Sequence, residues 1–377
     1  MSDEKISTEL LEETTMKKLI ALFLTLALLG SLAGCAGTTV VVGNCTCPPE
    51  RHEPVATPTD APEQTPEDVE VSGSLKTGLA VVANISGSAA ATADANGKAD
   101  YDITVAAVTV DENGVIRSCT IDSLGTSVAF DAAGLPAGFD PAAAILTKNE
   151  LGDGYNMKAY AGSKYEWYEQ AAAVAEFAVG KTADELASGA VNEAGKAADA
   201  DLASVATIYI GGYVNAIVKA VENAQSLGAQ AGDVLKIAII PAMEASAGQE
   251  AGGSAQLTLD VTAITMNGDT ITSCYIDSLQ AKVEFDGTGA LVTDVTAAPQ
   301  TKNELGDAYN MKAWGGAKYE WYEQAANFAA YVTGKTAAEV AGIAIDEATK
   351  PAADTDLAAS VTISVGGFQA LIEKAAK

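Results

Sequence analysis

The sequence is poor in positive charge and has almost no histidine. Of its 377 residues, 22 are Lys or Arg and 50 are Asp or Glu, so the formal net charge is −28, and His52 is its one histidine. A protein that binds nucleic acid must bring Lys and Arg to the phosphates, so this charge argues against a nucleic-acid partner. It equally argues against docking on an anionic membrane surface by charge alone. The sequence also lacks a P-loop, an HExxH motif and a Ser-His-Asp arrangement, so we assign no catalytic residues.

Cysteines are also few, and their positions do not suggest a disulfide framework. Cys119 and Cys274 occupy matching places in "RSCTIDSL" and "TSCYIDSL". Each is therefore expected to be a small buried apolar residue. Cys45, Cys47 and His52 would supply only three ligands, whereas a structural zinc site needs four. We therefore predict no metal site.

The segment from Met16 to Cys35 has the parts of a secretory signal. It reads "MKKLIALFLTLALLGSLAGC", with two lysines, an apolar run and small residues before the cysteine. This resembles a bacterial lipoprotein signal peptide, and the resemblance implies that Cys35 becomes the diacylated N-terminus. The apolar run is shorter than the ~20 residues of a membrane span. We expect residues 1–34 to be the signal peptide, with Met16 as the true start, and the lipid on Cys35 to anchor the protein at the extracellular face of the cell membrane.

Residues 35–74 lack the apolar residues needed for a core. The stretch "TPTDAPEQTPEDVEVSGS" is rich in Pro, Thr and acidic residues. Such a composition is typical of an extended, disordered stalk.

The remainder of the chain is a tandem duplication. "TKNELGDGYNMKAYAGSKYEWYEQAA" at 147–172 returns as "TKNELGDAYNMKAWGGAKYEWYEQAA" at 301–326. A repeat of this length is a complete domain rather than a solenoid unit. We predict two domains of one fold, at 75–226 and 234–377.

Each copy places strands before helices. "DYDITVAAVTV" and "VIRSCTIDSL" predict a hairpin, as do "LTLDVTAITM" and "TITSCYIDSL" in the second copy. "KYEWYEQAAAVAEFAVG" predicts a helix that ends at Gly180, and a short helix follows with Thr182 and Glu185 spaced as a capping box, matched by Thr336 and Glu339. The fold class is α+β, with an antiparallel sheet and packed helices in each repeat. The last helix of the first copy is expected to bury the stripe Ile210, Val214, Ile217 and Val221.

The segment before each last helix carries a repeated polar pattern. "DLASVATIYIGGY" places Asp201 six residues before Thr207, and "DLAASVTISVGGF" does the same with Asp356 and Thr362. Free N–H groups at a helix start favour a phosphate, and the Gly pair after each Thr lets a bulky group approach the backbone. The alternative is purely structural, with a β-branched Thr suited to a strand and an Asp that caps a turn.

These residues resemble the motif of the covalent FMN-binding domain family, Asp-x-x-Ser/Thr-Gly-Ala-Ser/Thr. Asp201, Ser204 and Thr207 match it, with Val in place of the Gly, and Asp356 and Thr362 keep the spacing in the second copy. In that family a flavin transferase esterifies the last residue with FMN phosphate. The whole layout is similar to the PplA-type lipoproteins of Gram-positive extracellular electron transfer. The resemblance implies two FMN groups, one on each Thr.

The repeated block offers further residues for a flavin pocket. The "ELGD" turn resembles the Glu-containing loop that borders the flavin in the wider family, and methionines follow it. The tyrosines and tryptophans of "KYEWYEQ" are candidates to stack on the flavin ring, or to fill the core. The resemblance assigns Glu150, Gly152, Glu304, Gly306, Met157 and Met311 to the pocket, and the aromatic candidates are Tyr165, Trp167, Tyr168, Tyr319, Trp321 and Tyr322.

Together these features predict a membrane-anchored electron carrier. Its electrons would come from a membrane NADH-linked or quinol-linked donor and pass to an extracellular acceptor such as ferric iron or free flavin. Two other classes remain open: a noncatalytic surface-binding or adhesion lipoprotein whose repeats extend its reach, and a flavin-using reductase with its own small substrate.

Overall fold

A computed structural model describes residues 73–248 and 251–377. The expected signal peptide, the lipidated Cys35, the residues Cys45, Cys47 and His52, and the stalk up to residue 72 lie outside these residues. Within the described ranges, no helix is long and apolar enough to cross a membrane.

Two antiparallel sheets form the framework. The first has the order β1-β2-β3-β4 and the second the order β5-β6-β7. The hairpins β2-β3 and β6-β7 confirm the two hairpin predictions, whereas the edge strands β1 and β5 were not predicted. The strands are β1 (Lys76–Asn84), β2 (Gly97–Val110), β3 (Ile116–Phe130), β4 (Pro136–Ala137), β5 (Val234–Ala247), β6 (Gly253–Asn267) and β7 (Thr270–Phe285).

The same series of helices follows each sheet, which confirms the α+β class and the tandem repeat. After the first sheet come α2 (Lys148–Leu151), η1 (Gly152–Tyr155), α3 (Met157–Ala161), α4 (Trp167–Ala178), α5 (Ala183–Gly189), α6 (Ala200–Val205) and α7 (Gly211–Glu222). After the second come α8 (Lys302–Leu305), η2 (Gly306–Tyr309), α9 (Met311–Gly315), α10 (Trp321–Val332), α11 (Ala337–Ala341), η3 (Asp356–Ala359) and α12 (Gly366–Ala376).

The predicted helix signals are also confirmed. Gly180 follows the C-cap of α4 with φ of 84°, a left-handed conformation that favours glycine. The capping boxes of Thr182 with Glu185 and of Thr336 with Glu339 are both present. Of the apolar stripe, Ile210, Val214 and Ile217 are buried against the sheet, whereas Val221 near the end of α7 is only half-buried.

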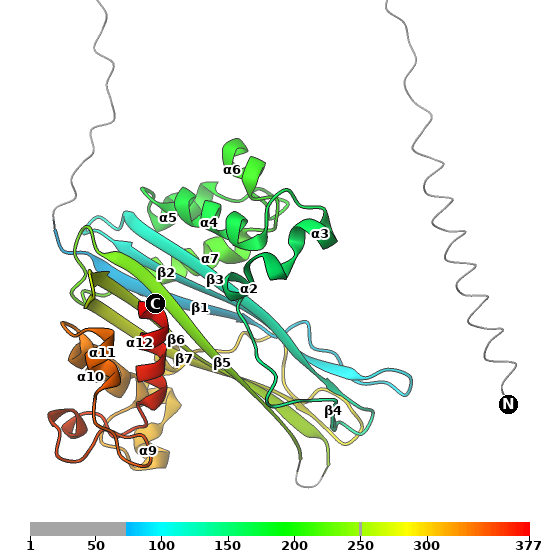
Figure 1. Ribbon diagram of the computed structural model, residues 1–377. Coiled ribbons are helices and arrows are strands. Elements are labelled where there is room, and N and C mark those ends of the chain that lie inside the picture. Colours follow the sequence, from blue (N-terminus) through cyan, green and yellow to red (C-terminus); the bar gives the residue numbers. More distant parts are fainter. Residues whose placement is uncertain (1–72, 249–250) are drawn as a thin grey trace, which may run out of the picture. The chain divides into compact units, whose positions relative to one another are not determined.

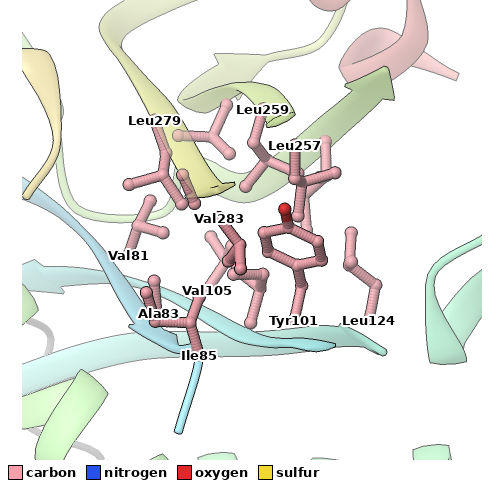
Figure 2. Packing of buried hydrophobic residues seen from close by; sticks show 14 of the residues in the cluster. Val81, Ala83, Ile85, Tyr101, Val105, Leu124, Leu257, Leu259, Leu279 and Val283 are labelled. Carbon is pink, nitrogen blue, oxygen red and sulfur yellow. The ribbon is translucent and has the colours of Figure 1, made fainter. Parts of the chain in front are cut away.

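The inner faces of the two sheets share one core. Figure 2 shows Val105 and Leu124 of the first sheet beside Leu257 and Val283 of the second, all buried. At the end of this core the rings of Phe130 and Phe285, which hold equivalent places in the two repeats, stack at 4.1 Å between centroids. The two repeats therefore form one compact unit in which each sheet covers the other.

The outer faces of the sheets carry the helices. In Figure 1, α4 and α7 lie on the first sheet and α10 and α12 on the second. Cys274 is buried in the outer core of the second repeat, as expected, while Cys119 is half-buried in the equivalent place of the first. The layer order is helix, sheet, sheet, helix, so each repeat has its own outer face with its own candidate site.

Candidate functional site

The two predicted threonines lie in equivalent loops. Thr207 lies between α6 and α7, four residues before Gly211, where α7 begins. Thr362 lies between η3 and α12, four residues before Gly366, where α12 begins. Both threonines are exposed. Each hydroxyl-bearing residue is thus accessible from solvent and close to a helix start, but not within its first turn.

The aspartates of the motif, Asp201 and Asp356, do not act as N-caps of the elements before these loops. The cap of α6 is Asp199, whose carboxylate accepts from the N–H groups of Asp201 and Leu202 at 3.0 and 2.9 Å. Asp201 is exposed, and its carbonyl accepts from Ser204 Oγ at 2.7 Å. Asp356 is exposed in the first turn of η3. The side chains of Asp201 and Asp356 are therefore free of the capping role that the structural alternative gave them.

A buried glutamine holds each threonine in place. Gln170 Oε1 accepts from Thr207 N at 2.8 Å, from Thr207 Oγ1 at 3.2 Å and from Ile208 N at 3.3 Å. In the second repeat, Gln324 Oε1 accepts from Thr362 N at 2.8 Å and from Thr362 Oγ1 at 3.1 Å. Both amides are fully buried. Because the backbone N–H alone still satisfies the glutamine oxygen, an ester at the hydroxyl would leave no buried group without a partner.

The same glutamines bring the predicted methionines to the threonines. Gln170 Nε2 lies 3.2 Å from Met157 Sδ and donates to Tyr165 O at 3.0 Å. Gln324 Nε2 lies 3.5 Å from Met311 Sδ. The start of α3 is fixed by buried Glu166, which accepts from Met157 N at 2.7 Å. Thr207 and Met157, and likewise Thr362 and Met311, therefore belong to one site.

In each repeat, a lysine lies over aromatic rings. Lys148 Nζ is 5.5 Å from the ring centre of Tyr155 and 5.1 Å from that of Trp167. Lys302 Nζ is 5.2 Å from Tyr309 and 4.8 Å from Trp321. Burial lowers the pKa of both lysines. Each repeat thus contains a partly desolvated cation beside aromatic rings.

In the second repeat these residues line a cavity of about 290 Å³. Lys302, Tyr309, Met311 and Trp321 form one side, and the residues directly after Thr362 form another. Phe368 of α12 meets the edge of Trp321 with the ring centres 5.9 Å apart. In the first repeat the equivalent Tyr213 accepts a hydrogen bond from Trp167 Nε1 at 2.9 Å. The cavity therefore lies beside the threonine, and its aromatic and apolar residues are joined by two charged ones, Lys302 and Asp260.

The predicted aromatic residues divide between the core and the site. Trp167 and Trp321 are buried, at 1% and 5% exposure, as the core interpretation expects. Tyr168 donates its hydroxyl to Asp153 at 3.2 Å, and Tyr322 to Asp307 at 3.3 Å. Tyr165 and Tyr319 are half-buried. Of these six, Trp321 lines the cavity beside Thr362.

The "ELGD" segments, predicted as turns, are instead the ends of α2 and α8 and the starts of η1 and η2. They contact the other repeat. Glu150 closes a capping box with Thr147, and its Oε1 lies 2.6 Å from Lys374 Nζ of α12. Glu304 does the same in the second repeat and lies 2.5 Å from Lys219 Nζ of α7. Gly152 and Gly306 follow with φ of 50° and 51°, a region that favours glycine. These contacts explain structurally why the segment is repeated in both copies. Its role beside a flavin stays a prediction.

A buried aspartate of each sheet accepts a hydrogen bond from the segment of its own repeat that contains "ELGD". Asp277 of β7 accepts from Ser278 N at 2.7 Å and from Asn303 N at 3.1 Å. Burial raises its pKa from the ordinary 3.8 to about 6, although hydrogen bonds from Thr301, Asn303 and Ser278 oppose the rise. Asp122 holds the equivalent place in β3, and burial raises its pKa as well.

This burial predicts a pH dependence of stability. The pKa of Asp277 is raised in the folded state, so folding favours its protonated form. Its contribution to the unfolding free energy is therefore fully present below pH 3.8 and is lost as the pH rises through about 6. Asn does not ionise, so the Asp277→Asn variant does not lose stability in this way as the pH rises. The stability of the variant relative to wild type should therefore increase by up to about 3 kcal/mol between pH 4 and 7. Urea denaturation at both pH values measures the difference. The exposed Asp94→Asn is the control, and a difference for Asp277→Asn that does not change with pH would contradict the prediction.

The sequence analysis missed the glutamines and lysines of the site. Gln170, Lys148 and Tyr155 all lie within or beside the quoted repeated blocks, as do Gln324 and Lys302. A usable signal existed: the Gln lies three positions after the Trp, and therefore on the buried face of a helix, where an amide needs a partner.

Comparison with known proteins identified no relative. No family model, curated protein or solved structure matches this chain.

Proposed function

We propose that the protein is a lipid-anchored electron carrier of the extracellular face, with FMN esterified to Thr207 and Thr362. One observation carries the proposal: in both repeats an exposed Thr is hydrogen-bonded to a buried Gln that also contacts a Met. In the second repeat a Lys-aromatic cluster lines the cavity beside this Thr. The fold repeats this arrangement on its two outer faces, so the chain would carry two FMN groups.

The residues present fit an FMN ester. The threonine side chains are accessible to a flavin transferase, and the glutamines keep a partner after modification. The cavity of about 290 Å³ beside Thr362 lies just below the ~300–1,000 Å³ range of ligand sites, so it suits part of a flavin rather than the whole group. Lys302 would place a positive charge beside an anionic ligand, and Asp260 in the same cavity would oppose part of that attraction. When bound, FMN supplies reversible redox chemistry, and the protein supplies its position and surroundings.

In this proposal the protein takes electrons from a membrane NADH-linked or quinol-linked donor. It passes them to an extracellular acceptor such as ferric iron or free flavin. The alternative is a noncatalytic surface-binding or adhesion lipoprotein, and a flavin reductase with its own substrate is the third class. Among the described residues, no specific contact favours the surface-binding lipoprotein or the flavin reductase.

Intact mass tests the attachment sites. Produced together with a flavin transferase, the wild-type chain should gain two increments, each the mass of FMN less one water. Thr207→Ala and Thr362→Ala should each lose one increment, because each removes one acceptor hydroxyl. Thr207→Ser and Thr362→Ser keep a hydroxyl, and they control for damage to the loop. If a single Ala variant kept both increments, the assignment of that threonine would be wrong.

A further inference from the structure

A second cavity lies away from both threonines, where the linker between the repeats crosses the second one. It measures about 380 Å³. Its base is formed by Cys274 and Ile276 of β7, one wall by α10, and its cover by the linker residues 225–227. We call it the linker cavity. Its volume lies within the ~300–1,000 Å³ that small-molecule sites occupy.

Small side chains on α10 create the space. Ala326, Ala329 and Ala330 face the linker cavity at positions i, i+3 and i+4, which share one side of a helix. Ala329 is buried, and Ala326 and Ala330 are exposed. Larger residues at these positions would fill the volume.

The cover of the linker cavity is fixed in place. Gln225 exchanges backbone hydrogen bonds with Thr77 of β1, at 2.9 and 3.0 Å, and its Nε2 lies 3.1 Å from Tyr275 Oη. Gly228 has φ of 113°, and a Cβ there would lie 2.3 Å from Thr272 O, so the linker runs against β7. The linker cavity is therefore a built feature of the junction rather than a gap under a loose segment.

The equivalent groove of the first repeat has a different character. It measures about 420 Å³ and is lined by Cys119, Tyr168 and Ala172, the counterparts of Cys274, Tyr322 and Ala326. Arg117 and Glu176 also line this groove, whereas every residue that lines the linker cavity is uncharged. The absence of charge is notable in a chain with a net charge of −28.

We propose that the linker cavity binds a neutral, mostly apolar aromatic molecule. Uncharged walls disfavour an ionic ligand, because burial of an unpaired charge is costly. Tyr275 and Tyr322 supply aromatic surface, and Gln225, Asn303 and Thr333 supply polar atoms at the walls. The site is distinct from the threonine sites, so ligand binding does not depend on a bound flavin.

A pair of matched probes tests the ligand class. N-phenyl-1-naphthylamine is neutral, and 8-anilinonaphthalene-1-sulfonate has the same rings with one negative charge. The test uses the full-length Thr207→Ala, Thr362→Ala variant, because it lacks the hydroxyls of the proposed flavin esters and no attached flavin would interfere with fluorescence. The neutral probe should bind at least roughly tenfold more tightly than the sulfonate, since the sulfonate would be desolvated among uncharged groups.

Hydrogen-exchange mass spectrometry locates the bound probe in the chain. The neutral probe should slow amide exchange in the linker and in α10, and Ala326→Leu should weaken this protection roughly tenfold by filling the linker cavity. Ala172→Leu is the matched control in the first repeat and should leave it unchanged. Circular dichroism confirms folding of both variants. The proposal is overturned if the linker and α10 show no protection, if Ala172→Leu acts like Ala326→Leu, or if the sulfonate protects the linker equally well.

Discussion

Replacement of Phe130 by Ala is expected to lower the free energy of unfolding by about 3–5 kcal/mol. The ring is fully buried, and it stacks on Phe285 of the other repeat with an interplanar angle of 19°. Its removal therefore opens a cavity between the two sheets and deletes an aromatic pair. Phe285→Ala should cost a similar amount, because the two residues hold equivalent positions. Urea denaturation followed by circular dichroism measures both.

The shared core also predicts how these variants combine. Because each Phe loses its partner in either single variant, the double variant should cost clearly less than the sum of the singles. Unfolding should remain a single transition, since each sheet buries its inner face on the other. Tyr160→Ala is the control, because that side chain is 88% exposed and its loss should change stability by less than about 0.5 kcal/mol. Two separate transitions, or fully additive losses, would contradict the shared core.

Local signals allowed the hairpins and the longer helices to be predicted from the sequence, whereas the short helices before α4 and α10 were not predicted. The hairpins follow from their β-rich runs around turn residues, and α4 from its composition and the Gly that ends it. The edge strands β1 and β5 were missed, although "KTGLAVVAN" of β1 is an apolar run of strand length. Its burial depends on pairing with β2, which a local pattern does not reveal.

The face-to-face packing of the repeats was also not predicted. The end of β2, from Ile103 to Val110, is buried on both faces, as a strand between two layers must be. This run could have indicated that something covers the inner face. That the cover is the other repeat depends on distant contacts, such as Tyr101 Oη donating to Ala255 O at 2.8 Å.

In the candidate site, too, the residues of local motifs were predicted, whereas contacts between distant parts of the chain were not. The threonines were placed before the last helices by the repeated motif, and the structure brings the methionines to them. The glutamines that connect these residues act across 37 and 38 positions of the chain, so no local spacing shows the contact. Glu150 and Glu304 have structural partners that the sequence analysis did not anticipate, because their lysines belong to the opposite repeat.

The proposed carrier function predicts that loss of both threonine hydroxyls abolishes electron transfer without unfolding the protein. Each hydroxyl donates one hydrogen bond to a glutamine that keeps a backbone donor, so each Thr→Ala change should cost only about 0.5–1.5 kcal/mol. The Thr207→Ala, Thr362→Ala protein should therefore stay folded and keep its location. Circular dichroism and membrane fractionation provide these controls, and the Thr207→Ser, Thr362→Ser protein is the matched variant that keeps both hydroxyls.

The most direct measurement is the reduction of an external acceptor by whole cells in medium without free flavin. The carrier account predicts that cells with the folded double Ala variant reduce ferric iron no faster than cells that lack the protein, while wild-type cells reduce it well above that background. Wild-type reduction rates with a folded, flavin-free double Ala variant would contradict the account.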